Sequence, residues 1–241
     1  MTIKTFTIIF TLALFITFGC GKKSGDTSKT DTKENTTTPT ETKVNEDSLK
    51  KVQDADKQQK IKDALAEDKL VTDTLGQWAI SAEASSSYGD ETNKDKTPYT
   101  AAQMTGKPDV ENYADDGRAW AEKEADKGME WVKLTYEKPV NATEVRVRQN
   151  VGPGAIIKVE LIDTDGKSHT VWEGEDKTQY IPEKIQYFIA KFDKTTYKTK
   201  VVKITMACNA VQGWNEIDAV QLVGDNTTTT TTTSTPTTPK K

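Results

Sequence analysis

Short segments in which apolar and polar residues alternate fill most of the chain between residues 75 and 224. In one of them Val132, Leu134 and Tyr136 alternate with polar residues, and residues 144–148 repeat the pattern. Because successive side chains of a β-strand point to opposite faces, a period of two indicates a strand with one buried face. Gly, Pro, Asp and Asn separate the segments, as turns between strands require.

This pattern predicts about eight strands and no long helix among them. The sequence DTDGK at residues 163–167 is typical of a hairpin turn joining two of the strands. A stretch of about 150 residues is long enough to bury one core. We therefore expect an all-β fold, an antiparallel β-sandwich of the jelly-roll type. The expected strands are residues 78–82, 132–136, 144–148, 157–161, 168–172, 186–192, 200–207 and 217–223.

The segments on either side of the predicted sandwich have a different composition. Residues 21–45 are almost entirely polar and predict a disordered tether, and residues 47–73 contain helix formers with a thin apolar face, which predicts a short, weakly packed helix. Residues 226–241 are rich in threonine and proline and predict a disordered tail. We expect a signal peptide at 1–19, a tether with the helix at 20–74, the sandwich at 75–224 and the tail at 225–241.

The first residues resemble the leader of a bacterial lipoprotein. Lys4 precedes an apolar run at residues 5–18, which is shorter than the roughly 20 residues of a spanning helix, and Cys20 follows Gly19. This order resembles a lipobox, although Thr17 stands where lipoboxes usually have leucine. The resemblance implies cleavage before Cys20, lipidation of its sulfur (including a palmitate-type acyl chain) and a location in the bacterial cell envelope, either periplasmic or surface-exposed. The alternative is an ordinary secretory signal with an incidental cysteine.

Composition argues against several classes of function. The net charge of −4 at pH 7 does not favour nucleic acid as a partner. His169 is the sole histidine, and Cys208 directly follows the predicted strand at residues 200–207, where a buried thiol is the expected state. With Cys20 lipidated, no intrachain disulfide is expected. The chain has no nucleophile-elbow, zinc-protease or P-loop motif, so we do not expect an enzyme.

Four sequence blocks resemble discoidin-like, galactose-binding-like domains of the coagulation factor V/VIII type C kind. They occur in order and cover residues 78–224, and blocks similar to the last one are found in pappalysin-type metalloproteases. The blocks are YTAAQMTGKPD at 99–109, YADDGRAWA at 113–121, NVGPGAIIKV at 150–159 and WNEIDAVQL at 214–222.

The resemblance implies a binding module whose ligand contacts loops at one end of the sandwich. It also implies a structural calcium ion, for which Asp115, Asp116 and Glu216 would supply carboxylate oxygens. This chain has Ala219 where sugar-binding relatives usually place their late glutamate. The alternative is that residues 116–117 form a turn, while Glu216 and Asp218 accept hydrogen bonds from loop amides.

Saccharide binding needs an aromatic face with polar groups beside it. Trp120, Trp131 and Trp172 are expected to be packing residues. Arg148 and Asn150 are two residues apart, so in a strand their side chains point to the same face and both could lie at one rim of the binding site. Alternatively, Arg148 pairs with Glu144 or Glu160 across the sheet. The predicted ligand-binding residues are Tyr88, Tyr99, Tyr113, Arg148, Asn150, Asn209 and Trp214.

These inferences together predict a monomeric, membrane-anchored lipoprotein that presents a non-catalytic binding module. Carbohydrate of the cell envelope or of the surroundings is the expected ligand. The alternative is a protein-interaction or adhesion module for an envelope or host protein. A glycan site predicts a concave patch with an exposed aromatic residue, whereas a protein site predicts a flatter and broader patch.

Overall fold

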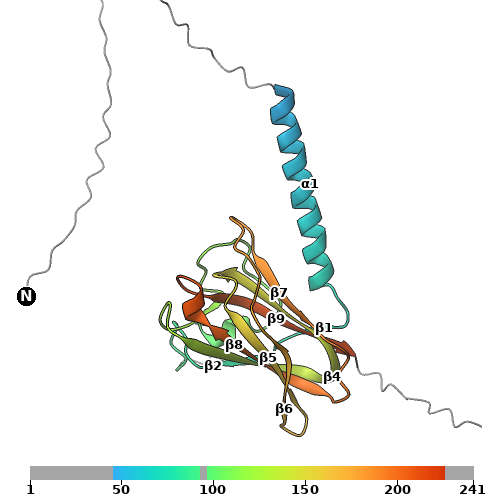
Figure 1. Ribbon diagram of the computed structural model, residues 1–241, viewed down its shortest axis with the longest axis vertical. Helices are drawn as coiled ribbons and strands as arrows, with labels where there is room; N and C mark the ends of the chain where they lie inside the picture. Colours follow the sequence, from blue (N-terminus) through green and yellow to red (C-terminus); the bar gives the residue numbers. More distant parts are fainter. Residues whose placement is uncertain (1–45, 93–96, 226–241) are drawn as a thin grey trace, which may run out of the picture. The chain divides into compact units, whose positions relative to one another are not determined.

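The computed structural model describes residues 46–92 and 97–225 (Figure 1). The predicted signal peptide, Cys20, the polar tether and the Thr-rich tail lie outside the described residues. The chain divides into two compact units, residues 1–49 and 50–241, and the second contains all the strands described below. Within the described residues, no helix is both long enough and apolar enough to span a membrane.

One α-helix and nine strands make up the regular structure of the described residues. Every ladder between these strands is antiparallel, and the strand order is β1-β9-β4-β8-β5-β6, with β2 and β7 added on β4 and β3 added on β9. This architecture confirms the predicted β-sandwich. The elements are α1 (Glu46–Val71), β1 (Gly76–Trp78), β2 (Ser81–Ala84), β3 (Trp120–Ala121), β4 (Met129–Val151), β5 (Ile156–Asp163), β6 (Ser168–Glu173), β7 (Gln186–Lys191), β8 (Thr199–Ala207) and β9 (Glu216–Asp225).

Strand β4 belongs to both layers of the sandwich. Its first half pairs with β2 and β8, and its second half pairs with β9 and β7. The register against β8 shifts between Thr135 and Val140, where Pro139 has no N–H to donate to a ladder. The two strands expected at 132–136 and 144–148 are therefore one bent strand. The sequence did not predict this continuity, because the proline and polar residues between the two segments are typical of a turn.

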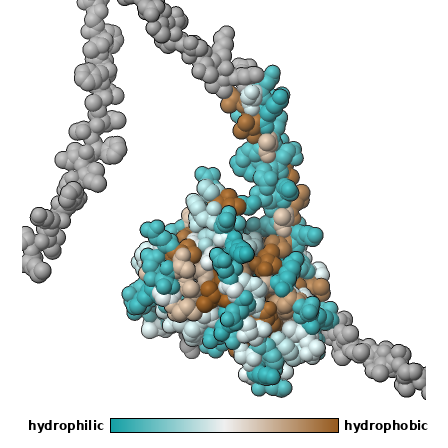
Figure 2. Space-filling model, in the orientation of Figure 1, coloured by the Kyte–Doolittle hydropathy of each residue, from teal (hydrophilic) through white to brown (hydrophobic). Residues whose placement is uncertain are grey.

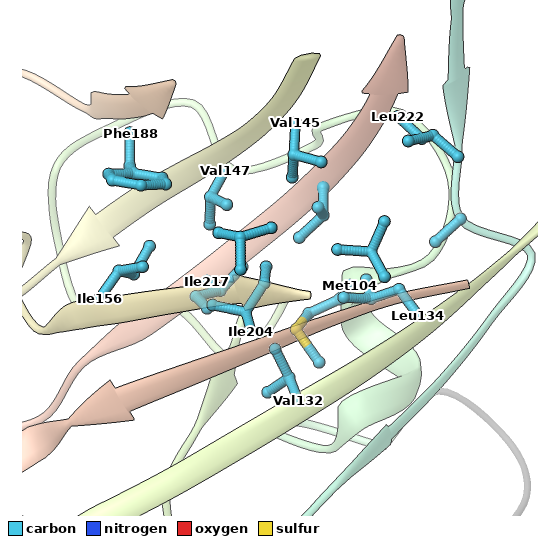
Figure 3. Close-up of a cluster of buried hydrophobic side chains, with 14 of the residues drawn as sticks. Met104, Val132, Leu134, Val145, Val147, Ile156, Phe188, Ile204, Ile217 and Leu222 are labelled. Atoms are coloured by element: carbon cyan, nitrogen blue, oxygen red, sulfur yellow. The ribbon is translucent and has the colours of Figure 1, made fainter. Parts of the chain in front are cut away.

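The core lies where the two halves of β4 face each other across the sandwich (Figure 3). The side chains of Val132 and Leu134 in the first half and Val145 and Val147 in the second are fully buried, as their alternation predicted. Met104 enters from the 3-10 helix Ala101–Met104. Cys208 is fully buried just after β8, and burial raises the pKa of its thiol to about 12, so it is a packing residue.

The outer face of β4 and β9 carries buried charges. Arg148 is 6% exposed and contacts Asp218 of β9 and Glu67 of α1, with 2.8 Å to the Glu67 carboxylate. Arg146 contacts Glu144 two residues away on the same strand and also Asp73, at 2.9 Å. Pairing was thus the better of the two interpretations of Arg148, but its partners are neither Glu144 nor Glu160.

Helix α1 is mostly solvated along its length. Leu49, Val52, Ile61 and Leu65 are 44–67% exposed, and the helix surface is largely hydrophilic with scattered apolar side chains (Figure 2). Its last turns are held by polar contacts, because Gln221 donates a hydrogen bond to the carbonyl of Leu70 at 3.1 Å in addition to the Glu67 contact. The expected helix is confirmed, and its packing is through polar groups of its final turns.

Candidate functional site

A pocket of about 430 Å³ opens where loops from three parts of the chain meet. One loop follows β2, one precedes β3, and one leads into β9. The lining residues are Tyr88, Tyr99, Asp115, Ala121, Val151, Trp214 and Glu216. Residues far apart in sequence are brought together because β3 and the end of β4 both pair with the start of β9.

Three aromatic rings form the apolar wall of this pocket. The ring of Tyr88 is nearly perpendicular to that of Tyr99, with centroids 5.3 Å apart, and to that of Trp214, with centroids 6.0 Å apart. Edge-to-face contacts of this kind hold the rings and leave aromatic faces open. Tyr88 remains 59% exposed and Trp214 remains 42% exposed. Large aromatic side chains grouped on a concave surface and open to solvent are typical of a binding site.

Tyr99 joins the aromatic wall to the polar side of the pocket. Its hydroxyl donates a hydrogen bond to Asp115 at 2.7 Å, and this bond, together with burial, raises the pKa of Tyr99 to about 12. Its backbone has φ 61°, an uncommon conformation for a bulky residue. The Tyr99 N–H donates to the carbonyl of Gly117 at 3.0 Å, and Tyr99 forms a bridge with Trp120. The surrounding loop thus maintains the strained position of the ring.

The Trp214 loop is held by buried polar groups on its neighbours. Glu122 is fully buried and accepts the N–H of Asn215 at 3.1 and 3.0 Å, one bond to each carboxylate oxygen. The Asn215 side chain donates to the carbonyl of Gly152 at 2.6 Å, and the Gly213 N–H donates to Asp126 at 2.9 Å. These bonds fix where Trp214 stands. Glu122 was not among the predicted residues, because its role depends on a contact 93 residues away.

Glu216 is the buried carboxyl of the pocket. It is 3% exposed, receives hydrogen bonds from the Asn150 side chain and from the N–H of Asp116, and lies within hydrogen-bonding reach of Asp115. Burial raises the pKa of Glu216 to about 8, and the nearby Asp115 acts in the same direction. The Asp116–Ala119 turn, closed by a 2.9 Å hydrogen bond, presents the loop amide to it.

The structure brings together some of the predicted ligand-binding residues and separates others. Tyr88, Tyr99 and Trp214 line one pocket, and Asn150 lies behind it, fully buried, as a support for Glu216. Arg148 is enclosed in its ion pairs and is not on the rim. Tyr113 lies outside the pocket lining, where its ring contacts that of Tyr180 at an interplanar angle of 53°, with centroids 4.9 Å apart. Asn209 is an exposed residue of the 3-10 helix Cys208–Ala210 and also lies outside the lining.

The carboxylates expected to hold calcium are engaged with other groups. Asp116 forms a forked ion pair with Arg118, which lowers its pKa, while Asp115 accepts from Tyr99 and Glu216 accepts from Asn150. Among the residues that the structure describes, no group of three or more acidic, cysteine or histidine side chains is arranged to hold a metal ion. These three residues do not form a calcium ligand set in this structure, and calcium binding by them stays a prediction.

The structure shows the alternative role of Glu216 and Asp218, in which they accept hydrogen bonds from the N–H groups of loops. Asp218 accepts hydrogen bonds from the N–H groups of Asp109 and Val110 at 3.3 and 3.5 Å, and Glu216 accepts from Asp116 at 3.3 Å. Residues 116–117 begin a turn. Through these hydrogen bonds, Glu216 and Asp218 of β9 hold the loops that precede β3.

The sequence of residues 68–233 matches the family described as "Pappalysin-1, SD scarf domain, C-terminal". This match spans more than half of the chain and includes every strand. The chain belongs to the pappalysin-1 SD scarf domain family. The match begins at Asp68, within α1, so the final turn of the helix is part of the scarf domain, as the hydrogen bond from Gln221 of β9 to the Leu70 carbonyl indicates.

Several solved structures are similar to the scarf domain. A mutant of the Ruminococcus gnavus GH29 fucosidase in complex with fucose is 15% identical with a TM-score of 0.43, and the match covers 65% of this chain but only 26% of that chain. Chitosan-binding module 1 of a chitosanase/glucanase from Paenibacillus sp. IK-5 is 12% identical, with a TM-score of 0.44 and coverage of 59% and 92%. The family 32 carbohydrate-binding module of Streptococcus pneumoniae EndoD is 10% identical, with a TM-score of 0.43 and coverage of 62% and 100%. A comparison with curated protein sequences gave no match.

Gly152 provides a test of how the scarf domain holds its pocket. It has φ 57°, and an added Cβ would overlap the carbonyl oxygen of Trp214 and lie 2.8 Å from the side-chain nitrogen of Asn215. We expect Gly152→Ala to lower stability by about 2–4 kcal/mol, measured by urea unfolding, because the loop must shift. Gly166→Ala is the control, since Gly166 has φ 86° with nothing within 4 Å and should lose only about 1 kcal/mol. Equal losses in the two variants would contradict the close approach of these loops.

The buried carboxyls predict that stability depends on pH. Burial raises the pKa of Glu122 to about 7, so the folded protein binds this proton more tightly than the unfolded chain does. Its contribution to stability is therefore complete below about pH 4.5 and is lost as the pH rises through 7, a loss of up to about 3 kcal/mol. We expect the melting temperature to fall between about pH 5 and pH 8.5.

Glu122→Gln should reduce this dependence on pH, because the amide oxygen still accepts the Asn215 N–H but carries no titrating proton. Glu216 adds a change in the same direction and should remain in the variant. Glu175→Gln, at an exposed position, is the control and should leave the pH profile unchanged. A melting temperature that rises over this range would contradict the assignment.

Proposed function

We propose that this protein is a cell-envelope lipoprotein whose scarf domain binds carbohydrate without transforming it. The observation that supports this proposal is the pocket with Tyr88, Tyr99 and Trp214 on one side and Asp115 on the other. An aromatic face packs against the apolar C–H face of a pyranose, and a carboxylate oxygen accepts hydrogen bonds from sugar hydroxyls. The pocket places both kinds of group within one concavity.

The size and openness of the aromatic surface favour a small saccharide ligand. A volume of about 430 Å³ lies within the range of small-molecule pockets. The edge-to-face contacts with Tyr88 hold the other two rings, so little side-chain freedom would be lost on binding. In this proposal Trp214 and Tyr88 contact the sugar ring, Tyr99 orients Asp115, and Glu122 positions the Trp214 loop.

His169 and Cys208 lie outside the aromatic pocket, which supports the absence of histidine- or cysteine-based catalysis there. The ring of His169 stacks on Tyr197 with centroids 3.8 Å apart and contacts Asp163 at 2.7 Å, next to the β5–β6 hairpin turn. Cys208 is buried with its pKa raised. Neither lines the aromatic pocket.

The anchor is a separate part of the proposal and rests on the sequence. Cleavage before Cys20 and lipidation of its sulfur would attach the chain to a bacterial membrane, with several acyl chains providing stable anchoring. Labelling cells with a palmitate analogue should modify the wild-type chain and leave Cys20→Ser unlabelled and released from the membrane fraction. Equal labelling of the two chains would contradict this anchor.

The competing function is a protein-interaction or adhesion module. A protein site would be flat and broad, whereas the exposed aromatic residues Tyr88 and Trp214 line a concave pocket. The concavity favours the saccharide, and a protein ligand remains an outcome of the test.

A glycan array probed with the full chain in mild detergent, with and without added calcium, tests the proposal. We expect saccharide hits, confirmed by calorimetry, that are competed by the free sugar. If no saccharide binds in either condition while envelope or host proteins are captured, the interaction module replaces the carbohydrate-binding function. A rise in melting temperature with calcium would separately support the predicted metal.

A further inference from the structure

Among the residues that the structure describes, the charged ones that line the aromatic pocket are both acidic. They are Asp115 and Glu216, and none of the described lining residues is a lysine, arginine or histidine. Asp115 also contributes to raising the pKa of Glu216. Two carboxyls that line one pocket favour a proton or a cation beside them.

The acidic residues close to these two in the sequence, Asp116 and Asp218, each have a guanidinium partner. Asp116 pairs with Arg118 at 2.7 Å, and Asp218 pairs with the buried Arg148. Among the residues that the structure describes, Asp115 and Glu216 form no salt bridge. The acidic pair of the pocket is thus distinguished from its neighbours by the lack of a basic side chain.

The aromatic wall adds to the preference for positive charge. The face of an aromatic ring is the negative side of its quadrupole and attracts a cation within about 6 Å of the ring centre. Tyr88 meets Tyr99 and Trp214 at interplanar angles of 81° and 87°, so ring faces in different directions border one hollow. Asp115 is held at this hollow by the 2.7 Å hydrogen bond from Tyr99.

We propose that the pocket selects a saccharide that carries a protonated amine, a 2-amino-2-deoxy sugar such as glucosamine in a β-linked oligomer. This inference rests on the proposed carbohydrate-binding function and adds the charge of the ligand to it. The ammonium group donates hydrogen bonds to Asp115 and Glu216, and the sugar ring packs on Trp214 and Tyr88. A neutral sugar makes the aromatic contacts but leaves the carboxyl pair without a cation.

Calorimetry of the full chain with three oligomers of equal length tests the proposal at about pH 6, where the amine is protonated. The ligands are β-linked glucosamine, N-acetylglucosamine and glucose. We expect the glucosamine oligomer to bind at least about tenfold more tightly than either neutral oligomer, with an advantage that shrinks at high salt. Equal affinities for the three ligands would overturn the amine selectivity and leave the carbohydrate-binding function standing.

Further outcomes separate the two proposals. If none of the three oligomers binds, the amino-sugar proposal is wrong, and the pocket is also not a binding site for β-linked glucose or N-acetylglucosamine. Tight binding of choline with no preference for glucosamine over N-acetylglucosamine would assign the pocket to quaternary amines and overturn the amino-sugar proposal.

Asp115→Asn is the informative variant, because it removes the charge and keeps a side chain of the same shape. We expect it to reduce the ratio of the glucosamine affinity to the affinities of the neutral oligomers to about twofold or less. Asp165→Asn, at an exposed position in the hairpin turn between β5 and β6, is the matched control and should keep the full preference. An unchanged preference in Asp115→Asn would overturn the proposal.

Discussion

Replacing Trp214 with alanine should reduce saccharide affinity by about a hundredfold, corresponding to about 2–3 kcal/mol, because the variant removes one aromatic wall of the pocket. The indole is 42% exposed and packs edge-on with Tyr88, so its loss should cost little folding stability. Calorimetry with the best saccharide from the glycan array measures the affinity. A melting temperature within a few degrees of wild type shows that the effect arises in the pocket.

A matched pair of tyrosines makes this result interpretable. Tyr88 lines the pocket and is 59% exposed, whereas Tyr180 is 57% exposed and lies outside the pocket lining. Tyr88→Ala should weaken binding about tenfold or more, and Tyr180→Ala should leave it unchanged. Unaltered affinity in Trp214→Ala, or equal losses in the two tyrosine variants, would move the ligand site away from this pocket.

Arg148→Met should cause the largest loss of stability, about 3–5 kcal/mol and about 10 °C in melting temperature. Arg148 is 6% exposed, and it contacts the carboxylates of Asp218 and Glu67 and the carbonyl of Val110. Its removal leaves the buried Asp218 without an opposite charge and releases the end of α1. Thermal and urea unfolding measure the change.

Arg118→Met is the control for this experiment. Arg118 also forms a forked pair with a carboxylate, Asp116, but its side chain is 47% exposed, so solvent screens the pair and the expected loss is much smaller than in Arg148→Met. Neutralising both buried partners in Arg148→Met with Asp218→Asn should recover part of the stability. A loss in Arg148→Met no greater than in Arg118→Met would show that the buried pair is not a stabilising contact.

Local periodicity was enough to predict most of the strands and most of the core. The strand expected at residues 78–82 is instead divided between the end of β1 and the start of β2, and the two-residue β3 was not expected. Val132, Leu134, Val145 and Val147 are buried as their alternation indicated, and Cys208 is a packing residue. The signal is strong because one face of each strand meets the core and the other does not. The join of residues 132–136 and 144–148 into a single β4 was not predictable in the same way, since Pro139 has the local signature of a turn.

The candidate site was predicted in part. Tyr88, Tyr99 and Trp214 were identified as aromatic residues of loops, and they do meet in one pocket. Tyr113 and Asn209 were selected by the same reasoning but lie outside the pocket lining, because residue type and loop position do not specify which loops converge. Asp115 and Glu216 were selected as calcium ligands and instead line the aromatic pocket.

The sequence by itself determined the class of fold, the strand positions and the kinds of residue available to a site, because these follow from burial patterns among near neighbours in the chain. The tertiary structure alone decided that Glu122 supports the Trp214 loop, that Arg148 is buried against Glu67 and Asp218, and that two carboxyls line one pocket with three aromatic rings. Each of these contacts joins residues separated by dozens of positions. Their geometry arises from the pairing of β3 and β4 with β9, which no local pattern encodes.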